Sequence, residues 1–298
     1  EEQLSLITWN IDGLDGDEQP ERARSLCSYL TEVKGHCTHV SNRPLHRYSA
    51  DVVLLQEMVQ PYMRFMHRRL GDEYAFIEGG QDGYFTMMLL KKSRLRLLDH
   101  HIVHFSKSGM KRNLLVAQVQ FGGQKLSLMT SHFESCKANA AERMRQLRLV
   151  MKAMSQAPDD QSVLFGGDTN LRDHEVRFFT PPPRGRQRSP LWFSLKNVKN
   201  RQEVAAVGLP GNVVDLWEEL GEPEKCRYTW DTRLNTNKEI PFKCRFRFDR
   251  VYLRRAGVDG VPLLEPRSMA LIGLEKLRCG MFTSDHWGIY STFSVMHT

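Results

Sequence analysis

The sequence lacks the features that mark several common classes of protein. No apolar run reaches the roughly 18 residues that a membrane-spanning helix needs, so no membrane span is expected. The six cysteines are scattered without a CxxC pair or zinc-type spacing, which indicates reduced thiols in a cytosolic or nuclear protein. A P-loop, a GxGxxG motif and a Ser-His-Asp elbow are also absent, so nothing indicates nucleoside-triphosphate binding, dinucleotide chemistry or acyl transfer.

The net charge of +7 is concentrated in two segments. Residues 33–50 contribute +3 and residues 176–203 contribute +6, which leaves the rest of the chain at −2. Both segments lack a sustained helical or strand period, and the second contains TPPPRGRQRSP, which is too rich in proline for a central strand or a helix. A basic chain often binds nucleic acid. Here, however, the basic charge belongs to two loops and not to the scaffold.

Runs with strand character alternate with helical stretches along the whole chain, which favours one α/β domain with large sheets spanning residues 1–298. The chain begins at EEQLSLITWN without Met or a signal peptide, so we expect the natural targeting segment to lie outside it. Periodicity predicts strands at 4–10, 51–57, 84–90, 113–121, 125–133, 162–168, 245–253 and 287–295, and helices at 21–33, 62–70 and 138–157.

Polar side chains recur where the predicted strands end. Each of them alone fits a turn residue, a helix cap or a buried core histidine. Five strand ends that all carry an acid, an amide or an imidazole are harder to attribute to chance, and in a sheet protein such ends meet at one rim. These residues are Asn10 and Asp12, Glu57, His132 and Ser135, Asp168 and Asn170, and Asp285 and His286.

Some of these residues offer ligands for a divalent metal ion. Glu57 and Asn10 carry hard oxygen atoms suited to one Mg²⁺ ion that keeps several waters, and Asp12 and Asp285 are further candidates. Soft ligands are too few for a zinc site. We therefore expect Mg²⁺, with Mn²⁺ as a substitute, acting as a Lewis acid on a non-bridging phosphate oxygen.

The remaining strand-end residues suit the hydrolysis of a phosphoester without a covalent intermediate. His132 and His286 can donate hydrogen bonds to phosphate oxygens as negative charge develops. Asp168 can orient and deprotonate an attacking water, with Asn170 limiting its direction. The Gly-Gly pair at 166–167 is expected to form a tight turn that aims the Asp168 carboxylate at the phosphate.

The motifs TWNIDG, LLQE, TSHFES, GGDTN and SDHWG, in this order, resemble the endonuclease/exonuclease/phosphatase superfamily of Mg²⁺-dependent phosphoesterases. The resemblance spans nearly the whole chain. It implies an α/β fold, a four-layer α/β sandwich in which two packed mixed β-sheets are flanked by helices. This expectation agrees with the alternation of strands and helices along the chain.

Longer stretches, including SLITWNIDGLD, YTWDT, FDR and GLEKLRCGMFTSDHWG, are similar to the 5′-tyrosyl-DNA phosphodiesterases within that superfamily. The resemblance implies hydrolysis of the phosphodiester between a protein tyrosine and a single-stranded or frayed 5′ DNA end, leaving a 5′-phosphate. Topoisomerase II-derived peptide is the implied adduct, and DNA repair the implied role. We expect a monomer in the nucleus, with the cytoplasm as a second location and no membrane attachment.

The same resemblance implies roles for residues that spacing does not single out. Asp249 of FDR would pair with His286, orient it and favour its charged form. A salt bridge between Asp249 and its neighbour Arg250 is the alternative. Arg172 and Ser135 would contact DNA phosphates.

The resemblance also implies an aromatic cage for the tyrosyl side of the substrate. Tyr84 and Trp230 would form this cage. Where the family has an arginine to complete it, this chain has Lys137. A lysine can lie over an aromatic face, but it lacks the planar fork of arginine.

Two segments depart from the family in length. Residues 34–49 and 177–205 are extra, and they coincide with the two basic segments. We interpret them as flexible insertions without a catalytic role. DNA-contacting loops and retained intron sequence are the alternatives.

Two other functions fit parts of the sequence. Another substrate of the superfamily, such as abasic-site DNA, poly(A) RNA or a phospholipid or inositol head group, would leave Tyr84 and Trp230 without an obvious task. A binding module with a decayed site is disfavoured, because a decayed site should have lost one of the expected catalytic residues and none is missing.

Overall fold

The computed structural model describes residues 2–31, 48–176 and 209–296. Within them the chain forms two six-stranded sheets, a two-stranded ribbon and a small number of helices. The insertions predicted at 34–49 and 177–205 lie outside the described residues, apart from Tyr48 and Ser49. No helix in the described part of the chain is long and apolar enough to cross a membrane.

The first sheet has the strand order β13-β14-β1-β2-β4-β3. β1 runs parallel to β2 and antiparallel to β14, so the sheet is mixed. Its strands are β1 (Gln3–Asn10), β2 (Val52–Val59), β3 (Tyr74–Glu78), β4 (Tyr84–Lys91), β13 (Leu263–Ile272) and β14 (Gly288–Met296).

The second sheet has the strand order β5-β6-β7-β8-β12-β9. β7 and β8 are parallel and the other pairs are antiparallel. Its strands are β5 (Leu95–His104), β6 (Asn113–Phe121), β7 (Gln124–His132), β8 (Ser162–Asp168), β9 (Val213–Asp215) and β12 (Asp249–Arg254).

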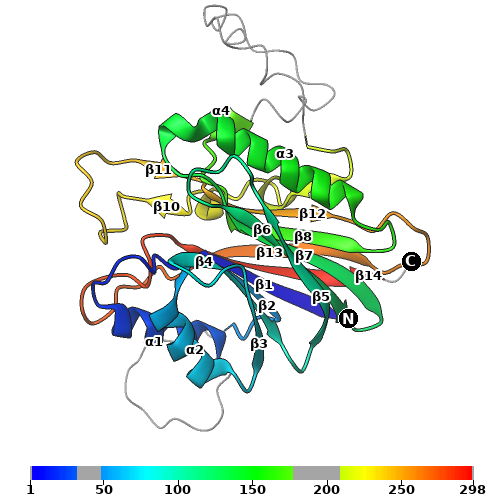
Figure 1. Ribbon diagram of the computed structural model, residues 1–298, viewed down its shortest axis with the longest axis horizontal. Helices are drawn as coiled ribbons and strands as arrows, with labels where there is room; N and C mark the ends of the chain where they lie inside the picture. The colour runs from blue at the N-terminus through cyan, green and yellow to red at the C-terminus, as the bar shows by residue number, and fades with distance from the viewer. Residues whose placement is uncertain (1, 32–47, 177–208, 297–298) are drawn as a thin grey trace, which may run out of the picture.

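Helices cover the outer faces of the two sheets (Figure 1). α1 (Gln19–Leu30) and α2 (Gln60–Leu70) pack on the first sheet through a cluster that contains Trp9, Leu26 and Met66. α3 (Ala140–Gln156) packs on the second through a cluster that contains Leu147 and Phe165. Shorter elements are α4 (Asp173–Val176), α5 (Leu216–Glu219), two 3₁₀ turns, η1 (Lys137–Asn139) and η3 (Glu224–Cys226), and the ribbon β10 (Trp230–Asp231) with β11 (Arg245–Phe246).

The two sheets face each other across a third apolar cluster. Leu6 and Leu54 from the first sheet and Leu128 and Leu164 from the second are all at most 1% exposed in it. Burial of apolar side chains on both faces of each sheet is the main force that holds the layers together. The order helix, sheet, sheet, helix confirms the predicted four-layer α/β sandwich with two mixed sheets.

Two local predictions are corrected by the structure. The stretch 245–253 is two strands, because the Phe248 carbonyl accepts hydrogen bonds from the backbone and hydroxyl of Thr169 and so leaves the ladder. The pair Gly166 and Gly167 lies inside β8 and forms no turn. A Cβ on Gly166 would lie 2.9 Å from a Leu54 methyl, so the absent side chain allows the sheets to approach closely.

Candidate active site

Four strand ends converge at one rim between the two sheets. The parallel pairing of β1 with β2 ends at Asn10 and Gln56, directly before Glu57, and the parallel strands β7 and β8 end at His132 and Asp168. Asp249 starts β12 directly opposite Asp168. The carboxyl ends of parallel strands lie at the same edge of a sheet, and here two such edges face each other.

Asn10 links the two sheets at the centre of the site. Its side-chain amide donates to Glu57 Oε1 at 3.1 Å and to Asp168 Oδ2 at 2.9 Å. Its side-chain Oδ1 accepts from the backbone N–H of Asp12 at 2.9 Å. Asn10 and Asp168 are each 1% exposed, so these hydrogen bonds are shielded from water. The two carboxylates are thereby held close together in a buried site.

His132 is held as a neutral hydrogen-bond donor. Burial, together with the guanidinium of Arg112, lowers its pKa to about 3. Arg112 Nη1 lies 3.1 Å from Nδ1, and because a guanidinium only donates, Nδ1 is the acceptor and the proton resides on Nε2. That Nε2 lies 3.4 Å from Asp168 Oδ2 and 3.9 Å from Glu57 Oε1.

His286 has the opposite charge state. Burial disfavours its charged form, but Asp249, Asp168 and Asp285 outweigh the burial and raise its pKa well above the usual value. Its Nδ1 lies 2.8 Å from Asp249 Oδ2, and its Nε2 lies 3.7 Å from Asp168 Oδ2. The site therefore sets a neutral imidazole and a cationic imidazole around one carboxylate.

Several site residues have a strained backbone. Asp12, Glu57 and Asn170 have φ values of 51°, 56° and 50°, a region that side chains other than glycine rarely adopt. Glu57 lies where the register between β2 and β4 shifts, and such a bulge can redirect a side chain. Strain of this kind is typical of active sites, where the surrounding structure must over-determine it.

The carboxylates at the rim fit a hard cation. Burial and the neighbouring Asp285 raise the pKa of Glu57, and this rise exceeds the lowering of the pKa by the hydrogen bond from Asn10 and by His286. Asp168 adds a further negative charge beside it. Carboxylate oxygens are the protein ligands that Mg²⁺ prefers. Glu57 and Asp285 are candidates to hold a divalent metal ion, and in the described part of the chain Asp168, Asp249 and His286 also bring ligand atoms within 4.8 Å of one another at this rim.

Asp12, another predicted metal ligand, is engaged differently. Its Oδ2 lies 2.9 Å from Lys238 Nζ and 3.5 Å from Arg22. Arg22 is fully buried and donates to the carbonyls of Asp12 and Thr283, so it ties the loop after β1 to the loop that carries Asp285. Sequence reasoning missed both cations, because neither lies in a strand-end motif.

The two predicted cage residues lie on different sides of the centre. Tyr84 makes an edge contact with His132 at 6.3 Å between ring centroids, whereas Trp230 donates to Asp285 at 3.3 Å. Phe248, which packs against Trp230, also contacts the ring of His286. Tyr84 therefore belongs to the His132 side of the site and Trp230 to the His286 side.

An arginine that the sequence did not single out lies over Tyr84. The guanidinium carbon of Arg112 is 4.9 Å from the ring centroid, and Arg112 Nη2 donates to Ser135 Oγ at 3.2 Å. Lys137, predicted to complete the cage, is exposed on η1, and no cation–π contact is recorded for it in the described part of the chain. A lone arginine before an apolar strand carries no sequence signal for this position.

Arg172 lies on the His286 side, over a stack of aromatic rings. Its guanidinium carbon is 5.8 Å and 5.5 Å from the ring centroids of Phe246 and Phe248. Those two rings are stacked 4.9 Å apart, and Trp230 packs against both. Flat aromatic faces beside an arginine are suited to nucleobases.

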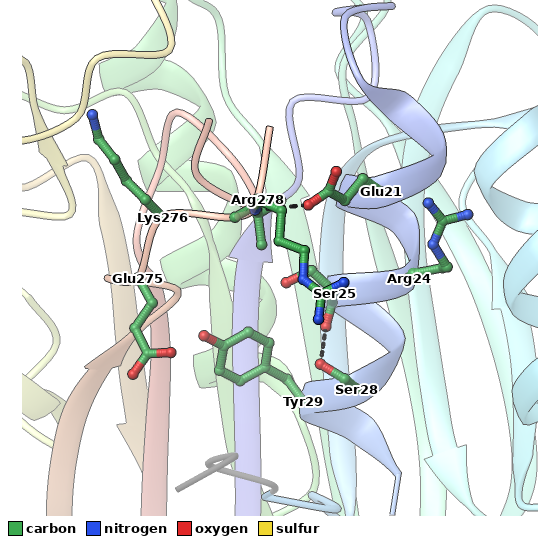
Figure 2. A pocket seen from close by; sticks show the side chains of 9 residues that line it. Glu21, Arg24, Ser25, Ser28, Tyr29, Glu275, Lys276 and Arg278 are labelled. Carbon is green, nitrogen blue, oxygen red and sulfur yellow. Dashed lines mark hydrogen bonds between the residues drawn. The ribbon is translucent and has the colours of Figure 1, made fainter. Parts of the chain in front are cut away.

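The described part of the chain contains, among others, two cavities of similar size. One of about 480 Å³ is open to the site, since Tyr84, Arg112 and His132 line it. The other, about 540 Å³, lies between α1 and residues 275–278 and has a mixed-charge lining (Figure 2). In it Glu21 accepts a hydrogen bond from the backbone of Arg278. None of the predicted site residues lines this second cavity, so it is separate from the chemistry described above.

Comparisons with known proteins agree with this geometry. The sequence profile described as the Endonuclease/Exonuclease/phosphatase family matches residues 7–286. The chain therefore belongs to the endonuclease/exonuclease/phosphatase family, as its motifs predicted, and it is a phosphodiesterase.

Within that family the chain is similar to tyrosyl-DNA phosphodiesterase 2. It is 47% identical to the Danio rerio protein over 98% of this chain and 67% of that protein, and 44% identical to the Homo sapiens protein over 98% and 68%. The chain thus spans about two thirds of the length of these relatives. The crystal structure of D. rerio TDP2 complexed with single strand DNA product has a TM-score of 0.81 and 46% identity, covering 99% of this chain and 100% of that one.

Proposed function

We propose that the chain is a Mg²⁺-dependent 5′-tyrosyl-DNA phosphodiesterase that releases a tyrosine-linked protein, such as topoisomerase II, from a 5′ DNA end. The similarity to tyrosyl-DNA phosphodiesterase 2 supports the substrate. The observation that carries the chemistry is the Asp168 carboxylate, held by Asn10 between a neutral His132 and a cationic His286. A water-activating base and two different donors around one point suit attack on a phosphate.

In the proposed reaction a water oxygen attacks the phosphorus, and the bond from phosphorus to the tyrosine oxygen breaks. Asp168 accepts the proton of the water, and Asn10 keeps its carboxylate aimed by donating to Oδ2. The DNA keeps the phosphate. His132 and His286 donate hydrogen bonds to the phosphate oxygens from opposite sides, and the charge of His286 offsets the developing negative charge.

Glu57 and Asp285 would hold the metal ion, which would supply Lewis-acid stabilisation at a non-bridging oxygen. Asn10 and Asp12 are further proposed ligands, although Asp12 would have to share its carboxylate with Lys238. Asn170 supports the base loop, because its backbone donates to Asp168 Oδ1 at 2.9 Å.

DNA is the proposed partner on the His286 side. The rings of Trp230, Phe246 and Phe248 offer stacking surfaces, and Arg172 a charge for the backbone. On the His132 side, Tyr84 and Arg112 would contact the tyrosyl part of the substrate. A single-stranded or frayed end is required, because a paired base cannot stack in this way. We propose that the protein acts as a monomer in the nucleus, with the cytoplasm as a second location.

The test compares a 5′-tyrosyl oligonucleotide with a 3′-tyrosyl one. We expect cleavage of the 5′ substrate alone, loss of turnover with EDTA, and loss of more than about 100-fold in kcat for Asp168→Asn. Metal-independent turnover would refute the mechanism. The alternative substrates are tested at equal enzyme concentration with abasic DNA, poly(A) RNA and an inositol phosphate. Faster cleavage of any of these than of 5′-tyrosyl DNA would make it the assigned substrate.

A further inference from the structure

The cavity of about 480 Å³ beside His132 has no role in the reaction as proposed so far. It lies between the loop that joins β3 to β4 and the ends of β5 and β6. Gly80, Asp82, Ile102, His104, Met110 and Lys111 line it, in addition to three residues of the catalytic centre, Tyr84, Arg112 and His132. Because the cavity shares these residues with the centre, we call it the His132 groove.

The two sides of the catalytic centre differ in chemistry. The His286 side carries stacked rings and Arg172, which suit nucleobases and a phosphate backbone. The His132 groove is formed largely by a glycine-rich loop and by the outer strand β5, whose other edge has no strand neighbour among the described residues. In the proposed reaction the scissile phosphate would lie between His132 and His286, so its DNA and tyrosyl substituents would extend to different sides.

We propose that the His132 groove is the subsite for the polypeptide segment that flanks the linked tyrosine, with a preference for segments that carry acidic side chains. This inference rests on the proposed function, because it assigns the second substituent of the same phosphate. It extends that function from the tyrosine itself to the residues on either side of it.

The walls of the groove suit an extended peptide. The loop 79–83 is held in place, since Gly79 N donates to Thr86 O at 2.7 Å and Asn113 Nδ2 donates to Gly79 O at 2.8 Å. Gly80 and Gly83 have no side chains to block a neighbouring backbone. Ile102 adds an apolar wall from β5. A preformed channel with exposed backbone groups is a common way to bind a peptide main chain.

The charges in the groove set its preference. Lys111 and His104 are exposed, and the Arg112 guanidinium lies at the inner end, while Asp82 at the rim is the opposing charge. Arg112 is already bonded to His132 and Ser135, so Lys111 is the cation of the groove that has no acidic partner among the described residues and can meet a flanking acid. Acidic side chains beside the tyrosine therefore complement the groove, and basic ones do not.

The experiment uses one oligonucleotide with three 5′ groups: phosphotyrosine alone, phosphotyrosine inside a short peptide with acidic flanks, and the same peptide with basic flanks. We expect kcat/KM to be about five times higher for the acidic peptide than for tyrosine alone, and not raised for the basic peptide. Lys111→Glu should abolish or reverse this order. Arg24→Glu, the same charge change at an exposed site on α1 that lines the other cavity, is the matched control and should leave the order unchanged (Figure 2).

Two results would overturn the subsite. One is an equal kcat/KM for all three substrates. The other is a fall in kcat/KM with Lys111→Glu that is equal for all three substrates and larger than the fall with Arg24→Glu. Such a result would mean that DNA crosses the groove. If no tyrosyl-DNA is cleaved, the proposed function itself fails. The groove is then judged by binding of a fluorescent acidic phosphotyrosyl peptide, which Lys111→Glu must weaken and Arg24→Glu must not.

Discussion

The guanidinium of Arg143 lies against the carboxylate of Glu175 in a two-point ion pair, 2.7 Å from Nη2 to Oε1 and 3.1 Å from Nε to Oε2. Arg143 is fully buried, and its Nη1 also donates to the carbonyls of Glu134 and Cys136. Glu175 in turn accepts from the backbone of Arg172. This pair therefore ties the loop after β7 to the loop after β8, and these loops directly follow His132 and Asp168 at the strand ends.

We expect Arg143→Lys to misplace these loops. A lysine keeps the charge but cannot bond the carboxylate at two points and the carbonyls at the same time. We predict a fall in kcat of about tenfold or more, since small displacements of reacting groups are costly. The measurement is kcat and KM at a temperature where circular dichroism shows the variant folded.

Arg145→Lys on the same helix is the matched control, because the Arg145 side chain is 43% exposed and its one salt bridge within the described residues is to Glu142 across one helical turn. The control should retain its kcat. An Arg143→Lys enzyme with normal kcat and only a lowered melting temperature would reduce this pair to a structural role.

Asp249→Asn should remove the charge that keeps His286 protonated. Asp249, with Asp168 and Asp285, raises the pKa of His286 against the effect of burial, so the neutral amide would favour an uncharged ring in this buried place. We predict a loss of about 100-fold or more in kcat with little change in KM.

The double variant tests whether Asp249 acts through His286. His286→Ala combined with Asp249→Asn should be hardly slower than His286→Ala alone, because residues that work as a unit are not additive. Losses that multiply would show that Asp249 has a task independent of His286; a salt bridge with Arg250 is not that task, because Arg250 pairs with Asp173 and Asp215.

The dependence of activity on Mg²⁺ concentration tests whether Glu57 is a metal ligand. EDTA should abolish turnover, and Mg²⁺ or Mn²⁺ should restore it. Glu57→Gln should raise the Mg²⁺ concentration for half-maximal activity by about tenfold or more, because a charged oxygen ligand is replaced by a neutral one. Glu275→Gln, an exposed acid beside the other cavity, is the control and should not shift the Mg²⁺ curve. An unchanged curve for Glu57→Gln would remove Glu57 from the metal site.

The stack of Arg112 on Tyr84 predicts different effects for two substitutions of the tyrosine. Tyr84→Phe keeps the aromatic face and should stay within about twofold of the parent in kcat/KM. Tyr84→Leu removes the face and should lose about 1 kcal/mol, which is about fivefold in kcat/KM for a tyrosyl substrate. Equal losses for both variants would assign the role to the phenol hydroxyl and not to the ring.

Much of the fold and of the rim could be predicted because the signals are local. A run of apolar residues predicts a strand, and the polar residue at the end of the strand lies within one or two positions of that run. Asn10, His132 and Asp168 were found in this way, and parallel pairing then brings them to one rim. The division of 245–253 was missed, since it depends on a hydrogen bond from Thr169, far away in the chain.

By itself, the sequence determined the main strands and helices and the polar residues at the strand ends, because hydrophobic period and short motifs involve neighbouring positions. The same motifs identified the family, and the family resemblance implied the four-layer architecture. Only the tertiary structure decided which cations meet which acids and rings. Arg112 over Tyr84, Lys238 on Asp12 and Arg143 on Glu175 join residues 28, 226 and 32 positions apart. No local pattern specifies such partners, since their energy comes from burial and charge pairing that exist only after the sheets have packed.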